Sequence, residues 1–326
     1  MSDTKHSAVS LTRLNEILTD ARRACDQGHR TAAANMLREV EQLAATLPVD
    51  TETRTFLATV KTSLGALSRA QGHYQQAEDL LREALEILES IHNAMTTTDA
   101  MAAVLNELGM LGKYIGHFDQ ASHYYQRALN ILENRHGRNN LQTAFVWHNI
   151  GGLFHARRDF AAAEAPTRRA MEIRIPLLGP DHLLVAADRA ALAPILIELG
   201  QLDEAETELK LALEVFRKEL GPCHHEVSVT LGNMGGLAYR RGREEEAKRR
   251  FKQSLKIKIS QLGSDHPDLA PTLNNLALIH HQQGHTKQAL SLYREAHRIL
   301  TANVSSDHPT LIAVNKAISA LTTDDS

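Results

Sequence analysis

A turn residue recurs along this chain at an almost constant interval, and it is glycine in six of seven copies. The spacing is 44 residues between the first three copies and 42 residues afterwards. The positions are Gly28, Gly72, Gly116, Arg158, Gly200, Gly242 and Gly284. An internal period of about 20 to 50 residues indicates a repeat protein, in which each unit packs against its neighbours. This period limits the possible folds more than any other feature of the sequence.

Small residues keep fixed distances from each turn position. Five residues after the turn, every copy has alanine: Ala33, Ala77, Ala121, Ala163, Ala205, Ala247 and Ala289. Twelve residues after it stand Ala84, Ala128, Ala170, Ala212, Ser254 and Ala296, with Val40 in the first copy. Seven residues before it, glycine or alanine follows a large apolar residue, as in Leu64-Gly65. Such columns allow two helices to cross closely while large neighbours fill the ridges. The sequence therefore predicts repeated helix pairs.

These columns resemble those of the tetratricopeptide repeat (TPR) family, which combine Leu-Gly, a turn glycine and the motif A-x3-[FYL]-x2-A. The resemblance covers roughly residues 10–321. The 42-residue unit, with linkers such as LGPDHLLVA (178–186) and LGSDHPDLA (262–270), is similar to the kinesin light chain type of TPR. The resemblance implies an all-α fold, a right-handed superhelical solenoid, and a function in binding cargo or peptides.

The predicted organisation is seven TPR-like helix-turn-helix repeats over residues 10–304 and a lone capping helix over 305–321. Residues 1–9 and 322–326 are expected to be flexible ends. A Thr-rich linker at 93–99 is expected to place Asp99 as the N-cap of the next helix. Pro166 and Pro194 fall inside predicted helices, so a kink or a change of pitch is expected at the centre of the array.

Composition narrows the function classes. The formal net charge is −3, with 36 basic and 39 acidic residues, so no overall field favours nucleic acid or an anionic membrane. No stretch approaches the ~18 apolar residues of a membrane span, and the first residues lack the apolar run of a secretion signal. Cys25 and Cys223 are too few for a disulfide framework. A cytoplasmic location is therefore expected.

A recurring Asp-His pair is the best candidate for metal chemistry. It occurs at Asp181-His182, Asp265-His266 and Asp307-His308. Residues one repeat apart are about 10 Å apart in stacked helices, too far to share an ion at ~2.1 Å. We therefore interpret the aspartate as the cap of the next helix. No catalytic or phosphate-binding motif occurs, and the pairs Gly151-Gly152 and Gly235-Gly236 are interpreted as packing glycines. We expect no enzyme activity, metal or cofactor.

Polar columns on the first helix of each repeat are the candidate binding site. In a TPR stack the first helices line the concave surface, and an asparagine amide can both donate to and accept from a peptide backbone. The predicted groove residues are Asn106, Lys113, His148, Asn149, His155, Asn233, Tyr239, Asn274, Asn275 and His281. An asparagine in these columns could instead bond a neighbouring helix. Ser63, Glu107 and Ala191 interrupt the column.

The second helices are expected to face solvent. Their most basic stretch is Lys248, Arg249, Arg250, Lys252, Lys256 and Lys258, which could meet an acidic partner or nucleic acid. Three glutamates at 244–246 precede it and offer ion-pair partners, so we interpret this run mainly as a solvated face.

The sequence thus favours an adaptor, scaffold or regulatory subunit that holds an extended or short helical peptide segment of a partner protein in its groove. One alternative is an architectural scaffold that self-associates, as a homo-oligomer, and binds no peptide. A further alternative is a His-rich, metal-assisted enzyme, which predicts bound metal and an activity that depends on His155 or His281.

Overall fold

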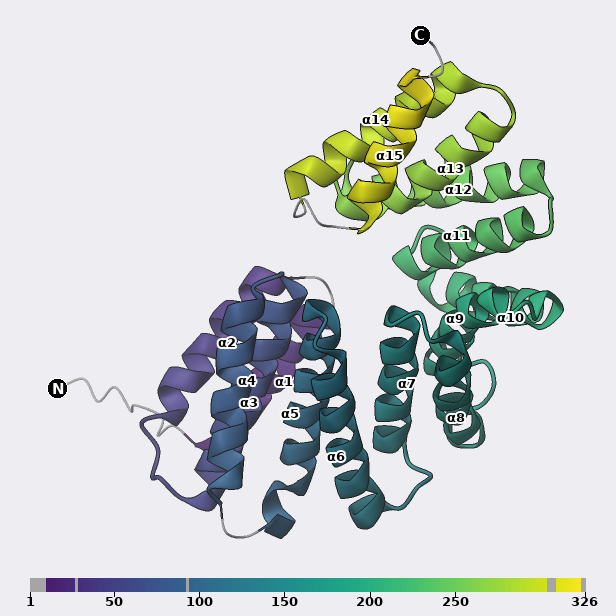
Figure 1. Ribbon diagram of the computed structural model, residues 1–326. Coiled ribbons are helices and arrows are strands. Elements are labelled where there is room, and N and C mark those ends of the chain that lie inside the picture. Colours follow the sequence, from purple (N-terminus) through teal and green to yellow (C-terminus); the bar gives the residue numbers. More distant parts are fainter. Residues whose placement is uncertain (1–9, 27–28, 92–93, 304–308, 324–326) are drawn as a thin grey trace. The chain divides into compact units, whose positions relative to one another are not determined.

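The computed structural model describes residues 10–26, 29–91, 94–303 and 309–323. Within these residues it contains fifteen α-helices, one short 3-10 helix and no strand (Figure 1). The helices pack in consecutive pairs, with a final helix after the seventh pair. The prediction of an all-α array of helix-turn-helix repeats with a capping helix is therefore confirmed. None of the described helices is long and apolar enough to cross a membrane.

The chain divides into two compact units, Met1–Ile173 and Arg174–Ser326. The helices of the first unit are α1 (Leu11–Asp26), α2 (Arg30–Ala44), α3 (Thr51–Ala70), α4 (Tyr74–Glu89), α5 (Ala94–Ile115), α6 (Phe118–His136) and α7 (Leu141–Ala156). Helix α8 (Phe160–Leu178) contains the boundary between the units. The second unit contains α9 (Leu183–Glu198), α10 (Leu202–Leu220), α11 (His225–Arg240), α12 (Glu244–Leu262), η1 (Pro267–Leu269), α13 (Ala270–Gln282), α14 (Thr286–Asn303) and α15 (Pro309–Thr323).

The two alanine columns form the seam of every helix pair. All seven residues five positions after the turn, and all seven residues twelve positions after it, are completely buried. A methyl group or a hydroxymethyl group fills these sites, except at Val40 in the first pair. Because interiors are close-packed, larger side chains here would push the helices apart. The columns recognised in the sequence are therefore the core contacts of the fold.

A second contact locks each first helix to its partner. Where the residue seven positions before the turn is glycine, it lies against the residue nine positions after the turn, which is large except at Thr167. A Cβ atom added to Gly109 would lie 2.6 Å from the ring of Tyr125, and one added to Gly65 would lie 2.7 Å from Cγ of Leu81. Tyr125 and Leu81 are both completely buried and cannot move aside. This contact explains why glycine is used in the middle of a helix, where it costs stability.

The turn residues adopt the left-handed conformation that the sequence pattern requires. Gly72, Gly116, Gly200, Gly242 and Gly284 have φ between 70° and 82°. Arg158 takes the same conformation with φ of 61°, and it is the one residue other than glycine with positive φ in the described part of the chain. Gly28, the predicted first turn, lies outside the described residues.

Histidine, and not aspartate, caps the helices that follow the Asp-His motif. Nδ1 of His182 accepts a hydrogen bond from the backbone N–H of Leu184 at 3.1 Å. His224 accepts in the same way from Glu226, and His266 from Asp268. The prediction of an aspartate cap was therefore wrong at Asp181 and Asp265, because the histidine is one residue nearer the helix. At His224 the preceding residue is Cys223, and the histidine caps the helix there too. Asp265 instead pairs with Arg298 at 2.7 Å. The pair Asp307-His308 lies outside the described residues.

Two predicted boundaries are also corrected. Helix α5 begins at Ala94, inside the stretch expected to be a linker, and Asp99 contacts His136 and Arg135 instead of capping a helix. The capping helix runs from Pro309 to Thr323, two residues beyond its predicted end. Residues 1–9, 305–308 and 324–326, which carry the other predictions for the ends of the chain, lie outside the described residues.

Replacing Arg158 by glycine should stabilise the protein by up to about 1 kcal/mol, because glycine adopts positive φ without a steric cost. The gain is reduced by loss of the guanidinium contact with the Phe160 ring, 5.6 Å from its centroid. The free energy of unfolding in urea measures the change. Gly200→Ala is the matched control and should destabilise by a similar amount. A destabilised Arg158→Gly variant would contradict the strain at this turn.

Removing a histidine cap should weaken the start of a helix. His224→Ala is expected to cost about 0.5–1 kcal/mol, because the N–H of Glu226 loses its acceptor. His224→Asn keeps an acceptor within reach and should retain most of the stability. Equal stabilities of the two variants in thermal unfolding would show that the ring nitrogen contributes nothing as a cap.

Candidate functional site

The first helices of successive repeats lie next to one another within each unit. In the first unit α1 contacts α3, α3 contacts α5, and α5 contacts α7; in the second unit α9 contacts α11. We call the surface that these helices share the first-helix face. In the first unit it contains a hollow of about 440 Å³. Small side chains, including Ala66, Ala70 and Ala103, line this hollow together with Arg22, Asn106 and Glu107.

Charged groups in the first unit are held in a partly desolvated environment. Nε and Nη2 of Arg69 donate to one carboxylate oxygen of Glu107 at 3.3 and 3.1 Å. Burial raises the pKa of Glu107, and the charge of Arg69 opposes that rise. Burial lowers the pKa of Lys113, and the nearby charge of Arg69 lowers it further. Burial also lowers the pKa of Arg22. The hollow therefore favours uncharged or well-paired polar groups.

Two of the predicted asparagines bond each other across adjacent repeats. Nδ2 of Asn149 donates to Oδ1 of Asn106 at 2.8 Å. Within the described part of the chain, Nδ2 of Asn106 contacts the sulfur of Met110 at 3.9 Å and no oxygen or nitrogen acceptor is recorded for it. Asn106 also lines a second, smaller hollow of about 140 Å³ between α5 and α7, with Gln142 and Phe145. One hydrogen bond of the two amides therefore joins neighbouring helices of the fold, and both side chains remain half-buried at the surface.

The other predicted residues of the first unit lie along α5 and α7. Nζ of Lys113 lies 5.3 Å from the ring centroid of Tyr114 and reaches towards Gly152 of α7. His148 is half-buried on α7. The ring of His155 packs edge-on against Phe160, with centroids 5.6 Å apart.

In the second unit the predicted residues lie on α11 and α13. Asn233, Asn274 and Asn275 are half-buried, and no hydrogen bond of their amides is recorded among the described residues. The hydroxyl of Tyr239 accepts a 2.6 Å hydrogen bond from Nε2 of Gln282 at the end of α13. His281 is exposed beside it. These amides therefore differ from the Asn106–Asn149 pair of the first unit.

The two Gly-Gly pairs divide into a packing residue and an open one. A Cβ atom on Gly151 would lie 2.1 Å from the Thr167 hydroxyl, and one on Gly235 would lie 2.8 Å from the Phe251 ring. A Cβ atom on Gly236 would meet nothing within 4 Å, and one on Gly152 only Nζ of Lys113 at 3.6 Å. The interpretation of all four as packing glycines was therefore wrong for Gly152 and Gly236.

Comparison with known families fits this architecture. A tetratricopeptide repeat model matches residues 100–175, 187–260 and 258–302, and a second tetratricopeptide repeat model matches residues 57–94. The chain belongs to the tetratricopeptide repeat family. The matched residues lie within the second to seventh helix pairs. Comparison with curated proteins finds no match.

Several solved TPR structures are similar to this chain. A Rap protein complexed with competence and sporulation factor has a TM-score of 0.70 at 14% identity, covering 95% of this chain and 87% of that one. NprR in complex with its cognate peptide NprX has a TM-score of 0.69 at 14% identity, covering 98% and 90%. BtubC (BKLC) from P. vanneervenii has a TM-score of 0.56 at 21% identity, covering 77% and 92%. At identities this low, the structural similarity shows that the fold is shared and shows no common role.

Residues beyond the predicted set also line this TPR surface. Arg22, Ala66 and Ala70 form the hollow in the first unit, and Phe145, 45% exposed, borders its neighbour. No common sequence signal marked them. Six residues before the turn, Ala66, Gly152 and Gly236 are small, but Arg22, Met110, Pro194 and Leu278 hold this position in the other repeats.

The described residues include no group of three or more His, Cys, Asp or Glu side chains placed to hold a metal ion. The histidines of the TPR linkers cap helices instead, at sites one repeat apart.

The two glycines of α11 should respond oppositely to alanine. Gly236→Ala is expected to stabilise by about 0.5–1 kcal/mol, because the methyl group meets open space and alanine favours helix. Gly235→Ala should destabilise by about 1–3 kcal/mol, because its Cβ overlaps the buried Phe251 ring. The free energy of unfolding of each variant in urea measures these changes. If both substitutions stabilised the protein, or both destabilised it, the placement of these two residues would be contradicted.

Proposed function

We propose that the chain is a non-catalytic binding module whose first-helix face holds an extended or short helical segment of a partner protein, as an adaptor, scaffold or regulatory subunit does. The proposed contact residues form two groups. Asn106, Lys113, His148, Asn149 and His155 belong to the first unit, and Asn233, Tyr239, Asn274, Asn275 and His281 to the second. The proposal includes a cytoplasmic location.

The observation that carries this proposal is the pair of open glycines. A glycine inside a helix costs roughly 0.5–1 kcal/mol relative to alanine. Packing accounts for that cost at Gly235, but nothing within 4 Å accounts for it at Gly236. Gly236 stands one helical turn after Asn233 and one turn before Tyr239, on the same side of α11. A bare backbone at the centre of a polar stripe is suited to close approach by another chain.

The amides supply the hydrogen bonds that such a chain needs. A bound peptide in extended form leaves its N–H and C=O groups unpaired unless the protein bonds them. Asn233, Asn274 and Asn275 each offer a donor and an acceptor. In the first unit, Nδ2 of Asn106 and the small-residue hollow offer the same combination on a smaller scale. Hydrogen bonds of this kind bind the main chain of a peptide. In this proposal the hollows determine which peptide side chains are accepted.

The solved structures agree with a role in peptide binding. The NprR structure contains its cognate peptide NprX, and the Rap structure contains competence and sporulation factor. Both cover most of this chain's length. Their fold supports the proposal for this chain, while the residues that would make the contacts are its own.

The test uses peptides selected on the wild-type chain from a random displayed library, with affinity measured by fluorescence anisotropy. Gly236→Trp fills the open site without touching the helix seam, and it should weaken binding by tenfold or more while thermal stability is retained. Glu214→Trp, an exposed position on the second helix α10, is the matched control and should bind normally. Asn233→Ala should weaken binding by a smaller factor.

Unchanged affinity in both Gly236→Trp and Asn233→Ala would overturn the proposed site. Failure to select any peptide, together with oligomers of the wild type in light scattering, would favour the self-associating scaffold instead.

A further inference from the structure

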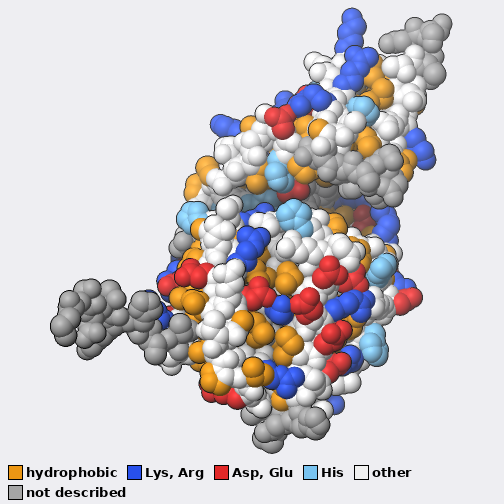
Figure 2. All heavy atoms as spheres, turned by 90° about the vertical axis from the view of Figure 1, so that its left-hand side faces the viewer, with side chains coloured by type: hydrophobic (Ala, Val, Ile, Leu, Met, Phe, Trp, Pro, Cys, Tyr) orange, Lys and Arg blue, Asp and Glu red, His pale blue; other side chains and the backbone are white. Residues whose placement is uncertain are grey.

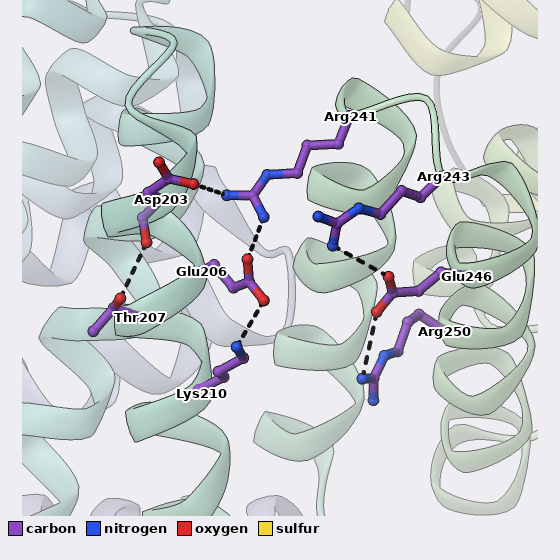
Figure 3. Close-up of polar contacts among 8 residues, drawn as sticks. All are labelled: Asp203, Glu206, Thr207, Lys210, Arg241, Arg243, Glu246 and Arg250. Atoms are coloured by element: carbon purple, nitrogen blue, oxygen red, sulfur yellow. Dashed lines mark hydrogen bonds and ion pairs between the residues drawn. The ribbon is translucent and has the colours of Figure 1, made fainter.

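Helix α12 carries cationic side chains on two of its sides, and the two sides differ in how many of these cations pair with a carboxylate. On the side near α10, arginines of α12 and of the turn that precedes it pair with carboxylates. Arg241 pairs with Asp203 and Glu206, while Glu246 lies 3.7 Å from both Arg243 and Arg250 (Figure 3). Glu206 also pairs with Lys210 at 2.7 Å (Figure 3). Opposite charges therefore balance on this side of α12. Acidic and basic side chains are likewise mixed on the face of the first unit that Figure 2 shows.

The other side of α12 is a stripe of cations with little compensation. Its members recur at three- and four-residue spacing, so they share one face of the helix, opposite the buried residues Ala247, Phe251 and Ser254. Four cationic side chains, Lys248, Arg249, Lys252 and Lys256, line an open hollow of about 490 Å³. Glu245 and Gln253 complete its lining. We call this surface the α12 basic stripe.

Only one cation of the stripe has a recorded partner of opposite charge. Nζ of Lys248 lies 3.9 Å from Glu245 and 3.3 Å from the side-chain oxygen of Gln283. For Arg249, Lys252 and Lys256, which are exposed, no ion pair is recorded among the described residues. Glu245 is 80% exposed and offsets only part of the charge. Of the three glutamates that precede the run in the sequence, only Glu246 pairs with the arginines of the other side. Glu245 lies in the stripe itself, and Glu244 accepts a hydrogen bond from Gln283.

The positive charge of the stripe also affects the neighbouring His280. The pKa of His280 is lowered, first by burial and then by the charges of Lys248, His285 and Lys252, against which Glu245 acts weakly. The positive charge around the stripe thus extends to the end of α13.

We propose that the α12 basic stripe is a second docking surface, which binds an acidic segment of a partner protein. The stripe extends over twelve residues of the helix, from Glu245 to Lys256, a rise of roughly 16 Å at 1.5 Å per residue, which suits several carboxylates in a row. Gln253 adds an amide that can bond a backbone.

The lining favours protein over nucleic acid. Single-stranded nucleic acids are held by a basic groove together with aromatic side chains on which bases stack. None of the residues that line this hollow is aromatic. The surface lies on a second helix, so it is independent of the peptide site proposed on the first-helix face.

The test measures binding of a fluorescein-labelled oligoglutamate about 12 residues long, enough to span the stripe in extended form. Arg249→Glu combined with Lys252→Glu should weaken binding by tenfold or more, and the wild-type affinity should fall with rising salt. The matched control is Arg217→Glu with Lys218→Glu, an equal change of charge at exposed positions of α10. It should change affinity by less than about twofold, since screening limits distant charges. Circular dichroism verifies the fold of each variant.

Equal losses in the two double variants would overturn the proposal, because they would reflect net charge alone. Tighter binding of a single-stranded oligonucleotide of the same length than of the oligoglutamate would also overturn it, and would assign the stripe to nucleic acid. Neither outcome depends on whether Gly236→Trp affects peptide binding.

Discussion

The structure depends on how closely two helices of a pair can approach. Fourteen seam positions, two in each second helix, are completely buried, and thirteen of them hold alanine or serine. Opposite them, a glycine or alanine of the first helix receives a large residue such as Tyr125 or Phe251. Because interiors tolerate little change of volume, these columns fix the crossing of the helices and hence which side chains remain outside. The surfaces proposed for binding are formed by the side chains that the seam leaves outside.

The fold was predictable because the seam repeats. Contacts between helices of one pair join residues at constant sequence offsets, so a column such as Ala33 to Ala289 shows them directly. Details of the helix ends were less accessible. The cap at His182 depends on which of two adjacent polar residues, Asp181 or His182, has the right geometry, and the start of α5 at Ala94 overrides a Thr-rich sequence. Tertiary context decided both.

The groove residues remain a prediction, and the sequence could not show how their side chains are bonded. The asparagine columns point to the first helices, but only the structure shows that Asn149 bonds Asn106 while no such bond is recorded for Asn233 among the described residues. Likewise, Gly235 and Gly236 are equivalent in the sequence and opposite in space. One accommodates Phe251 and the other faces outwards. A residue's column gives its direction, but its partner across the helix pair determines whether it serves the fold or remains available for binding.

The central claim is that the amides of the first-helix face contact a partner's main chain. The most direct measurement is NMR of the asparagine side-chain amides while a peptide selected on the wild type is added. The account predicts that the resonances of Asn233, Asn274 and Asn275 shift on binding, while that of Asn130, exposed on the second helix α6, does not. Shifts at Asn130 with unchanged resonances on α11 and α13 would contradict it.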